Sequence, residues 1–191
     1  YNGETLQTLY FGGGTPSLLS SQEFEAVISL FKINKTTEIT AELNPEKLSE
    51  EYLKELKAAG INRLSIGCQT FDEKILNAIG RKHTPKDVEF AVKTAQDNGF
   101  ENISLDFIYG LPEQTLESFT DDLSHAQSLD IQHISLYGLK IENEEHFMEL
   151  LNQGALNTAK PEISLQITFV GKVLGQQQKY ILKRVYQLNP Q

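Results

Sequence analysis

A stretch near the start of the chain combines an apolar run with groups that could hold a small molecule. Residues 6–16 read LQTLYFGGGTP, so a segment with the composition of a buried strand ends in three glycines, a threonine and a proline. Glycines can adopt positive φ and let a ligand approach the main chain closely, and Thr15 adds a hydroxyl. A tight turn that merely requires glycine would give the same pattern. The motif alone leaves a turn and a ligand-binding loop equally open.

Two acidic residues occupy positions in predicted strands. Asp106 lies inside the apolar run NISLDFI, where an unpaired carboxylate would be costly, and Glu42 ends the strand EITAE. Such carboxylates need hydrogen-bond donors. A structural partner such as Arg63 or Arg81 could supply them, and so could a bound ligand.

The elements that must position these residues follow a regular rhythm. Predicted strands begin near residues 6, 38, 63, 102 and 133, and each gap between them holds a predicted helix. This pattern predicts repeated βα units around a parallel sheet, either a barrel or part of one, or an open doubly wound sheet. Five strands are too few for a complete eight-stranded barrel.

In a parallel sheet, the residues at the carboxyl ends of the strands share one rim, where ligands bind. We therefore expect a set of polar groups to lie close together there: Gly13, Gly14, Thr15, Glu42, Asn44, Gln69, Asp106 and Tyr137.

Composition excludes several classes of function. A net charge of −9 argues against a nucleic-acid partner held through its phosphates, and no run of 18 apolar residues could span a membrane. The single cysteine, Cys68, excludes an internal disulfide framework and any cluster built from several cysteines of this chain, and it favours a reducing, cytoplasmic location. Neither G-x-x-x-x-G-K-[ST] nor G-x-G-x-x-G occurs, and the four histidines show no metal-binding spacing.

The composition changes after Gly154. Residues 155–191 carry five basic residues against one acid, a net of +4, and residues 1–154 are strongly acidic. We predict a βα core over residues 1–154 and a divergent, loosely docked or poorly ordered tail over residues 155–191. The chain begins at Tyr1 rather than Met and enters a predicted strand within a few residues. We therefore expect it to be a fragment or a processed product.

Five ordered blocks carry a resemblance to a known family. They are YFGGGTPSLL, AELNPE, GINRLSIGCQTFDEKILNAIGRKH, NISLDFIYGLPEQT and HISLYGLKIE, which together span about residues 6–147. The chain resembles the radical S-adenosylmethionine (SAM) proteins of the oxygen-independent coproporphyrinogen III oxidase-like family. The GRKH segment, with Arg81 and His83, is more similar to the heme-chaperone branch than to the oxidase branch.

The resemblance implies a fold and a set of cofactor contacts. The fold would be part of a (β/α)6 barrel. The glycine motif would hold the methionine moiety of SAM, Arg81 would bind carboxylate, and Glu42 and Asp106 would accept from the amine and the ribose. The implied SAM-binding residues are Gly13, Gly14, Thr15, Glu42, Gln69, Arg81, Asp106 and, through its backbone near the adenine, Gly138.

One departure from the family concerns its metal centre. Members carry a C-x-x-x-C-x-x-C loop that ligates a [4Fe–4S] cluster, and this chain has no such loop. Cys68 is interpreted as a packing thiol. We therefore expect this chain to bind SAM as its cofactor, whereas the cluster would be present only in a full-length parent. The isolated chain should carry out no radical chemistry. A truncated gene product, a cloned fragment or a degenerate copy would explain the missing loop.

Three functions remain open. The parent could be an oxidase-like enzyme that decarboxylates a porphyrinogen propionate, a heme-binding protein that delivers heme to targets, or a catalytically inactive remnant. The expected partners are small molecules, namely SAM with a porphyrinogen or heme.

Overall fold

Five parallel strands form a single sheet in the computed structural model, which describes residues 3–13 and 16–139. The strands are hydrogen-bonded to one another in sequence order. They are β1 (Thr8–Phe11), β2 (Glu38–Leu43), β3 (Arg63–Gln69), β4 (Ile103–Tyr109) and β5 (His133–Gly138). A doubly wound sheet reverses its strand order at a switch point, and this sheet does not. The fold is therefore the predicted partial (β/α) barrel.

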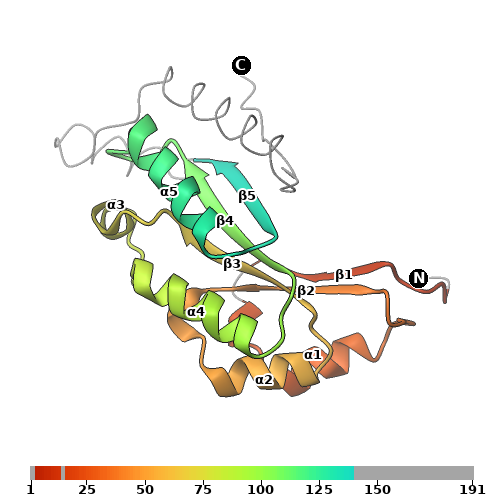
Figure 1. Cartoon of the computed structure of the whole chain (residues 1–191). Helices are drawn as coiled ribbons and strands as arrows, with labels where there is room; N and C mark the ends of the chain where they lie inside the picture. The colour runs from red at the N-terminus through yellow and green to blue at the C-terminus, as the bar shows by residue number, and fades with distance from the viewer. Residues whose placement is uncertain (1–2, 14–15, 140–191) are drawn as a thin grey trace.

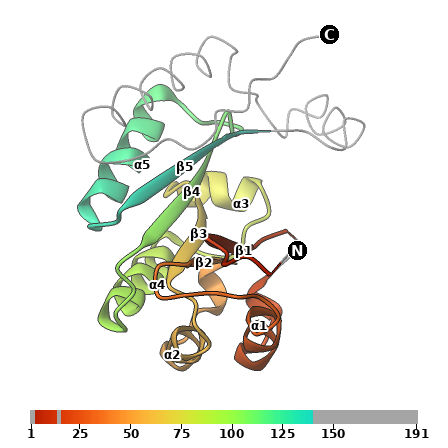
Figure 2. The same ribbon diagram turned by 90° about the vertical axis from the view of Figure 1, so that its right-hand side faces the viewer.

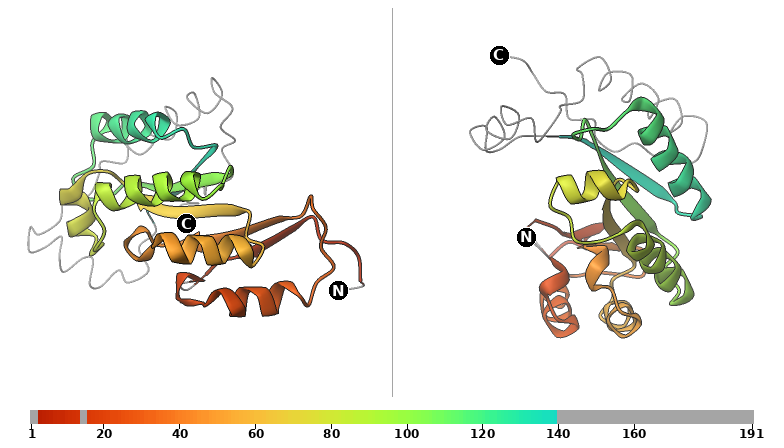
Figure 3. Two further views of the ribbon diagram at one scale, coloured as in Figure 1. Left: turned by 60° about the horizontal axis from the view of Figure 1, so that its bottom comes forward. Right: turned by 90° about the vertical axis from the view of Figure 1, so that its left-hand side faces the viewer.

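The helices follow the sheet in an arc along one of its faces (Figures 1 and 2). They are α1 (Ser21–Ile28), α2 (Glu50–Ala58), α3 (Glu73–Ala78), α4 (Pro85–Asp97) and α5 (Leu116–Ser128), with two short 3-10 helices, η1 (Pro16–Leu18) and η2 (Pro45–Lys47). The short helix α3 lies beyond the carboxyl end of β3, whereas α4 and α5 run alongside the strands (Figure 3).

Local sequence signals explain where these helices begin. Ser20 and Thr84 each form a capping box with the acid three residues on, Glu23 and Asp87 respectively. Pro85 then occupies the first position of α4, where its missing N–H costs nothing.

The sheet has one apolar and one polar face because its side chains alternate with a period of two. In β3, Leu64, Ile66 and Cys68 are buried on the helix side in the main hydrophobic core. The intervening residues Arg63 and Ser65 point to the opposite side, which we call the inner face. The inner face is also lined by Tyr10, Glu38, Thr40, Glu42, Gln69, Asp106, His133, Ser135 and Tyr137. The buried position of Cys68 agrees with its interpretation as a packing thiol.

The predicted domain boundary at residue 154 and the predicted tail over residues 155–191 lie outside the described residues. Within the described ranges, the structure contains no helix that is long and apolar enough to cross a membrane.

Candidate functional site

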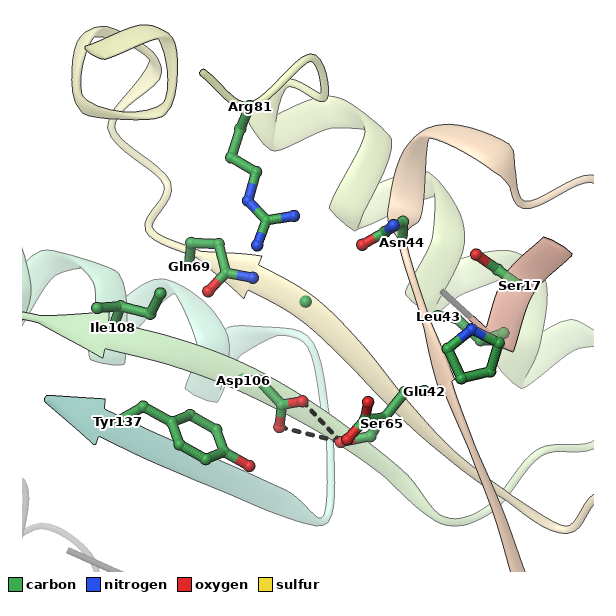
Figure 4. A pocket seen from close by; sticks show the side chains of 12 residues that line it. Ser17, Glu42, Leu43, Asn44, Ser65, Gln69, Arg81, Asp106, Ile108 and Tyr137 are labelled. Atoms are coloured by element: carbon green, nitrogen blue, oxygen red, sulfur yellow. Dashed lines mark hydrogen bonds between the residues drawn. The ribbon is translucent and has the colours of Figure 1, made fainter. Parts of the chain in front are cut away.

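A cavity of about 370 Å³ opens on the inner face at the carboxyl ends of the strands (Figure 4). It brings together six of the residues implicated by the sequence. They are Glu42 from β2, Asn44 just after it, Gln69 from β3, Arg81 from the α3–α4 loop, Asp106 from β4 and Tyr137 from β5. The remaining lining residues are Pro16, Ser17, Leu43, Ser65, Gly67 and Ile108. The expected shared rim is thus present.

Asp106 lies on the floor of this cavity and is held by hydroxyl groups. Ser65 Oγ donates to its two carboxylate oxygens at 3.0 and 2.8 Å, and Ser104 Oγ lies 3.5 Å from Oδ1. Burial is the main cause that raises the pKa of Asp106 to about 6, against the lowering effect of the serine hydrogen bonds. The sequence suggested an arginine as a structural partner, but Arg63 donates instead to Thr40 Oγ1, at 3.3 Å. Asp106 therefore faces the cavity as a carboxylate with neutral hydrogen-bond partners.

Glu42 stands between the glycine loop and the cavity. Its Oε1 accepts from the Tyr10 hydroxyl at 2.6 Å, and its Oε2 accepts from the backbone N–H of Gly13 at 3.1 Å. Burial and the neighbouring Glu42 carboxylate raise the pKa of Tyr10, so the tyrosine stays a donor. These two hydrogen bonds fix the carboxylate at the cavity edge.

Gln69 closes β3 in an unusual backbone conformation. Its φ is +68°, and the Thr70 N–H donates to the Cys68 carbonyl at 2.9 Å, which makes a γ-turn centred on Gln69. A non-glycine residue in such a conformation costs about 1–3 kcal/mol and is typical of functional sites. Gly67 makes room for the Gln69 side chain, since a Cβ on Gly67 would lie 2.9 Å from the Gln69 Nε2.

Arg81 supplies the cationic group of the cavity. Helix α3 ends at Ala78, Gly80 turns the chain with a φ of +71°, and the Arg81 N–H then donates to the Leu76 carbonyl at 2.9 Å. The guanidinium lies on the opposite side of the cavity from Asp106 (Figure 4). The cavity thus presents one cation and two carboxylates, an arrangement suited to a zwitterionic amino acid that carries a further polar group.

Four of the predicted residues are not among those that line the cavity. Gly13 is linked to it through its N–H, which donates to Glu42. Gly14 and Thr15 lie outside the described residues, and of the glycine loop the structure describes Gly12 and Gly13. Gly138 ends β5 but does not line the cavity, and the Tyr109 hydroxyl occupies the space next to it, 3.1 Å from where a Cβ would be. Its contact with a cofactor stays a prediction.

Sequence reasoning missed two residues that organise the site, Tyr10 and Ser65. Both could have been found from the alternation of the strands. Ser65 is four residues before Gln69 and therefore shares its face, and Tyr10 precedes the glycines on the inner face of β1.

The residues of this chain do not fit an iron–sulfur cluster. Cys68 is the single cysteine of the sequence, has no exposed surface and lies on the helix side of the sheet, away from the cavity. Within the described ranges, no group of three or more histidine, cysteine or acidic side chains could hold a metal ion. By contrast, the charged and polar groups of the cavity fit the amino acid and ribose moieties of SAM.

Comparison with known proteins identifies the family. A family model described as the radical SAM superfamily matches residues 2–126. The chain belongs to the radical SAM superfamily. The family expected from the sequence is thereby confirmed.

Similar proteins narrow the resemblance. The chain is 42% identical over 164 residues to the heme chaperone HemW of Bacillus subtilis, and the alignment covers 82% of this chain and 43% of that protein. It is 38% identical over 144 residues to HemW of Escherichia coli, with coverages of 73% and 38%. The chain thus spans about two fifths of the length of these curated relatives.

A solved structure of the same superfamily is also similar to this chain. Coproporphyrinogen III oxidase HemN from Escherichia coli, described as a radical SAM enzyme, matches with a TM-score of 0.76 and 26% identity. The match covers 91% of this chain and 41% of that structure. Both the oxidase-like family and its heme-chaperone branch, as expected from the sequence, are supported by these similarities.

Proposed function

We propose that this chain is the SAM-binding part of a HemW- or HemN-like radical SAM protein. The observation that carries the proposal is the cavity at the carboxyl ends of the strands, where Glu42, Gln69, Arg81 and Asp106 converge from four separate segments. Radical SAM membership supplies the cofactor class, and the chemistry of the side chains supplies the fit.

Each polar side chain has a role that matches its chemistry. Arg81 binds the methionine carboxylate, Glu42 accepts from the α-ammonium group, and Asp106 accepts from the ribose hydroxyls. Gln69 adds an amide that can both donate and accept. When bound, SAM supplies a sulfonium whose carbon–sulfur bond can be cleaved reductively. No cluster fits the residues of this chain, and their role is therefore to bind SAM.

Titration calorimetry with SAM tests the proposal. We expect measurable binding, weakened at least about tenfold by Glu42→Gln or Asp106→Asn, since a lost charge-assisted hydrogen bond costs about 1.5–3 kcal/mol. Glu101→Gln is the matched control, because Glu101 is exposed and precedes β4, at the opposite end of the sheet. Equal affinities in all three variants would contradict the proposed site.

Heme binding is the second candidate function. It is favoured by the relatives at about 40% identity, which are named heme chaperones. His83, in the segment that resembles the chaperone branch, is 2% exposed and so cannot reach heme iron without a rearrangement of its loop. A hemin titration followed by the Soret band, made with the full-length parent because no cluster fits this chain, separates the candidates. A heme chaperone saturates at stoichiometric hemin, whereas an oxidase-like parent turns over coproporphyrinogen.

We also propose a cytoplasmic location and small-molecule partners without nucleic acid. The buried, free thiol of Cys68 is compatible with a reducing compartment, and the net charge of −9 disfavours phosphate backbones.

A further inference from the structure

The strained end of β3 depends on a single carbonyl group. Gln69 adopts a φ of +68°, and the γ-turn around it is closed by the Thr70 N–H, which donates to the Cys68 carbonyl at 2.9 Å. Such turns are rare in proteins because they are strained, and they persist only where the surroundings hold them. The surroundings of the Cys68 carbonyl should therefore contain a second contact.

That contact is a buried histidine. His83 Nε2 lies 3.0 Å from the Cys68 carbonyl oxygen, and the side chain has no exposed surface. Because a carbonyl oxygen only accepts hydrogen bonds, Nε2 must carry the proton. The same oxygen thus receives two donors, one from Thr70 and one from His83.

The second ring nitrogen of His83 faces Glu46. Nδ1 is buried without a hydrogen-bond partner and lies 3.5 Å from Glu46 Oε2. Glu46 belongs to η2, two residues after Asn44, which lines the cavity. The imidazole therefore packs between the end of β3 and η2.

The residues next to His83 in the chain include Arg81, which lines the cavity. Arg81 is two residues before His83, and Thr84 directly after it is the N-cap of α4, with its hydroxyl accepting from the Asp87 N–H. Just after Arg81, its loop is thus anchored twice, by the buried imidazole of His83 and by the cap of α4, and its own N–H ties it back to the Leu76 carbonyl.

We propose that His83 is a positioning residue for the SAM site. It acts through the Cys68 carbonyl to hold the γ-turn of Gln69, and it tethers the loop of Arg81 to the same strand end. The inference rests on the proposed function, and it goes beyond that function because it assigns binding energy to a residue that does not line the cavity. His83 is a donor to the backbone in this role, not a ligand of heme or metal.

Two variants separate the hydrogen bond from simple packing. His83→Gln keeps an amide that can donate to the Cys68 carbonyl, whereas His83→Leu fills the space without a donor. We expect His83→Leu to weaken SAM binding about five- to tenfold, the loss of one ordinary hydrogen bond, and His83→Gln to recover most of that loss. Thr94→Val, a buried substitution on α4 ten residues beyond Thr84, should leave the affinity unchanged. Equal losses in the leucine and glutamine variants would overturn the proposal.

A double-mutant cycle tests the route through Gln69. If His83 acts by positioning Gln69 and the Arg81 loop, His83→Leu should cost less in a Gln69→Ala background than in the wild type. If the fold-loss in affinity of the double variant equals the product of the losses in the two single variants, the route through Gln69 is contradicted.

Nuclear magnetic resonance of the ligand-free chain tests the proposal without SAM and without a variant. The ¹⁵N spectrum of His83 should show the tautomer protonated at Nε2, with a slowly exchanging proton coupled to the Cys68 carbonyl. A proton on Nδ1 alone would overturn the proposal, even if SAM binds. If the wild type fails to bind SAM, the proposed function is rejected, but the tautomer of His83 still shows whether it holds the γ-turn.

Discussion

At the residue scale, Asp106 shows how the fold prepares a carboxylate for a ligand. Its two oxygens already accept from Ser65, which fixes their direction, while burial keeps its pKa near 6. The serines carry no charge and cannot act as counter-ions, so the cost of ionising this carboxylate is not fully offset in the ligand-free protein. A ligand that donates hydrogen bonds to Asp106 would favour the ionised form.

This property predicts a pH dependence of binding. Because the pKa of Asp106 is raised to about 6, the group is largely protonated at about pH 5 and ionised at about pH 7. Ribose hydroxyls bind the carboxylate better than the acid, so SAM affinity should rise through this range and then level off. Calorimetry at several pH values measures the effect, and Asp106→Asn should remove the part that titrates near 6. A wild-type affinity that falls over the same range would argue against Asp106 as an acceptor.

At the element scale, the alternation of the strands decides which side chains face the cavity, and the backbone conformation of the loops decides where their side chains lie. In β3, the alternation places Ser65, Gly67 and Gln69 on the inner face, and Gly67 leaves the space that the Gln69 amide occupies. Gly99, by contrast, serves only the backbone: it follows α4 with a φ of +79° and has no atoms within 4 Å of the place where a Cβ would lie. The two kinds of glycine predict different mutant behaviour.

Gly67→Ala should displace the Gln69 side chain, because the new methyl would lie 2.9 Å from its Nε2, the flexible end of that side chain. We expect SAM affinity to fall several-fold with little change in the free energy of unfolding, as measured by urea denaturation. Gly99→Ala should do the reverse: it should lower stability by about 1 kcal/mol, because alanine is strained at positive φ, and leave the affinity intact. A loss of affinity in Gly99→Ala equal to that in Gly67→Ala would show that stability, not the position of Gln69, controls binding.

Alternation and spacing were sufficient to predict the strands, the helices between them and the rim that carries Glu42, Gln69 and Asp106. Alternation also places Tyr10 and Ser65 on the inner face, but it does not pair them with Glu42 and Asp106. The Tyr10–Glu42 hydrogen bond joins β1 to β2 across 32 residues, and the Ser65–Asp106 pair joins β3 to β4 across 41. Such contacts depend on strand register, which spacing alone does not give. The γ-turn at Gln69 was hidden for a different reason, since glutamine carries no sequence signal for positive φ.

At the scale of the whole molecule, the sheet is half of a barrel with helices along one face. The opposite, inner face is polar from one end of the strands to the other, and Tyr10, half exposed, stands at its edge. A complete metal centre would require several thiolates at the carboxyl end of this face, whereas the single thiol of the chain is buried on the other side.

Anaerobic reconstitution with iron and sulfide should therefore leave this 191-residue chain without a stable cluster. The expected result is no absorbance of iron–sulfur type after desalting and no cleavage of SAM under reducing conditions. A Cys68→Ser variant, matched in size, should behave identically. Near-stoichiometric iron retained with a cluster spectrum would show that ligands other than the chain's own cysteine complete the site.

The central claim is that SAM binds at the carboxyl ends of the strands, and chemical-shift mapping of the ¹⁵N-labelled chain tests it most directly. On addition of SAM, the account predicts saturable shifts at the backbone amides of Gly13, Gln69 and Arg81, around the cavity, with none at Asn62 and Glu101 at the opposite end of the sheet. Saturable shifts confined to the opposite end, or no shifts at millimolar SAM, would contradict it.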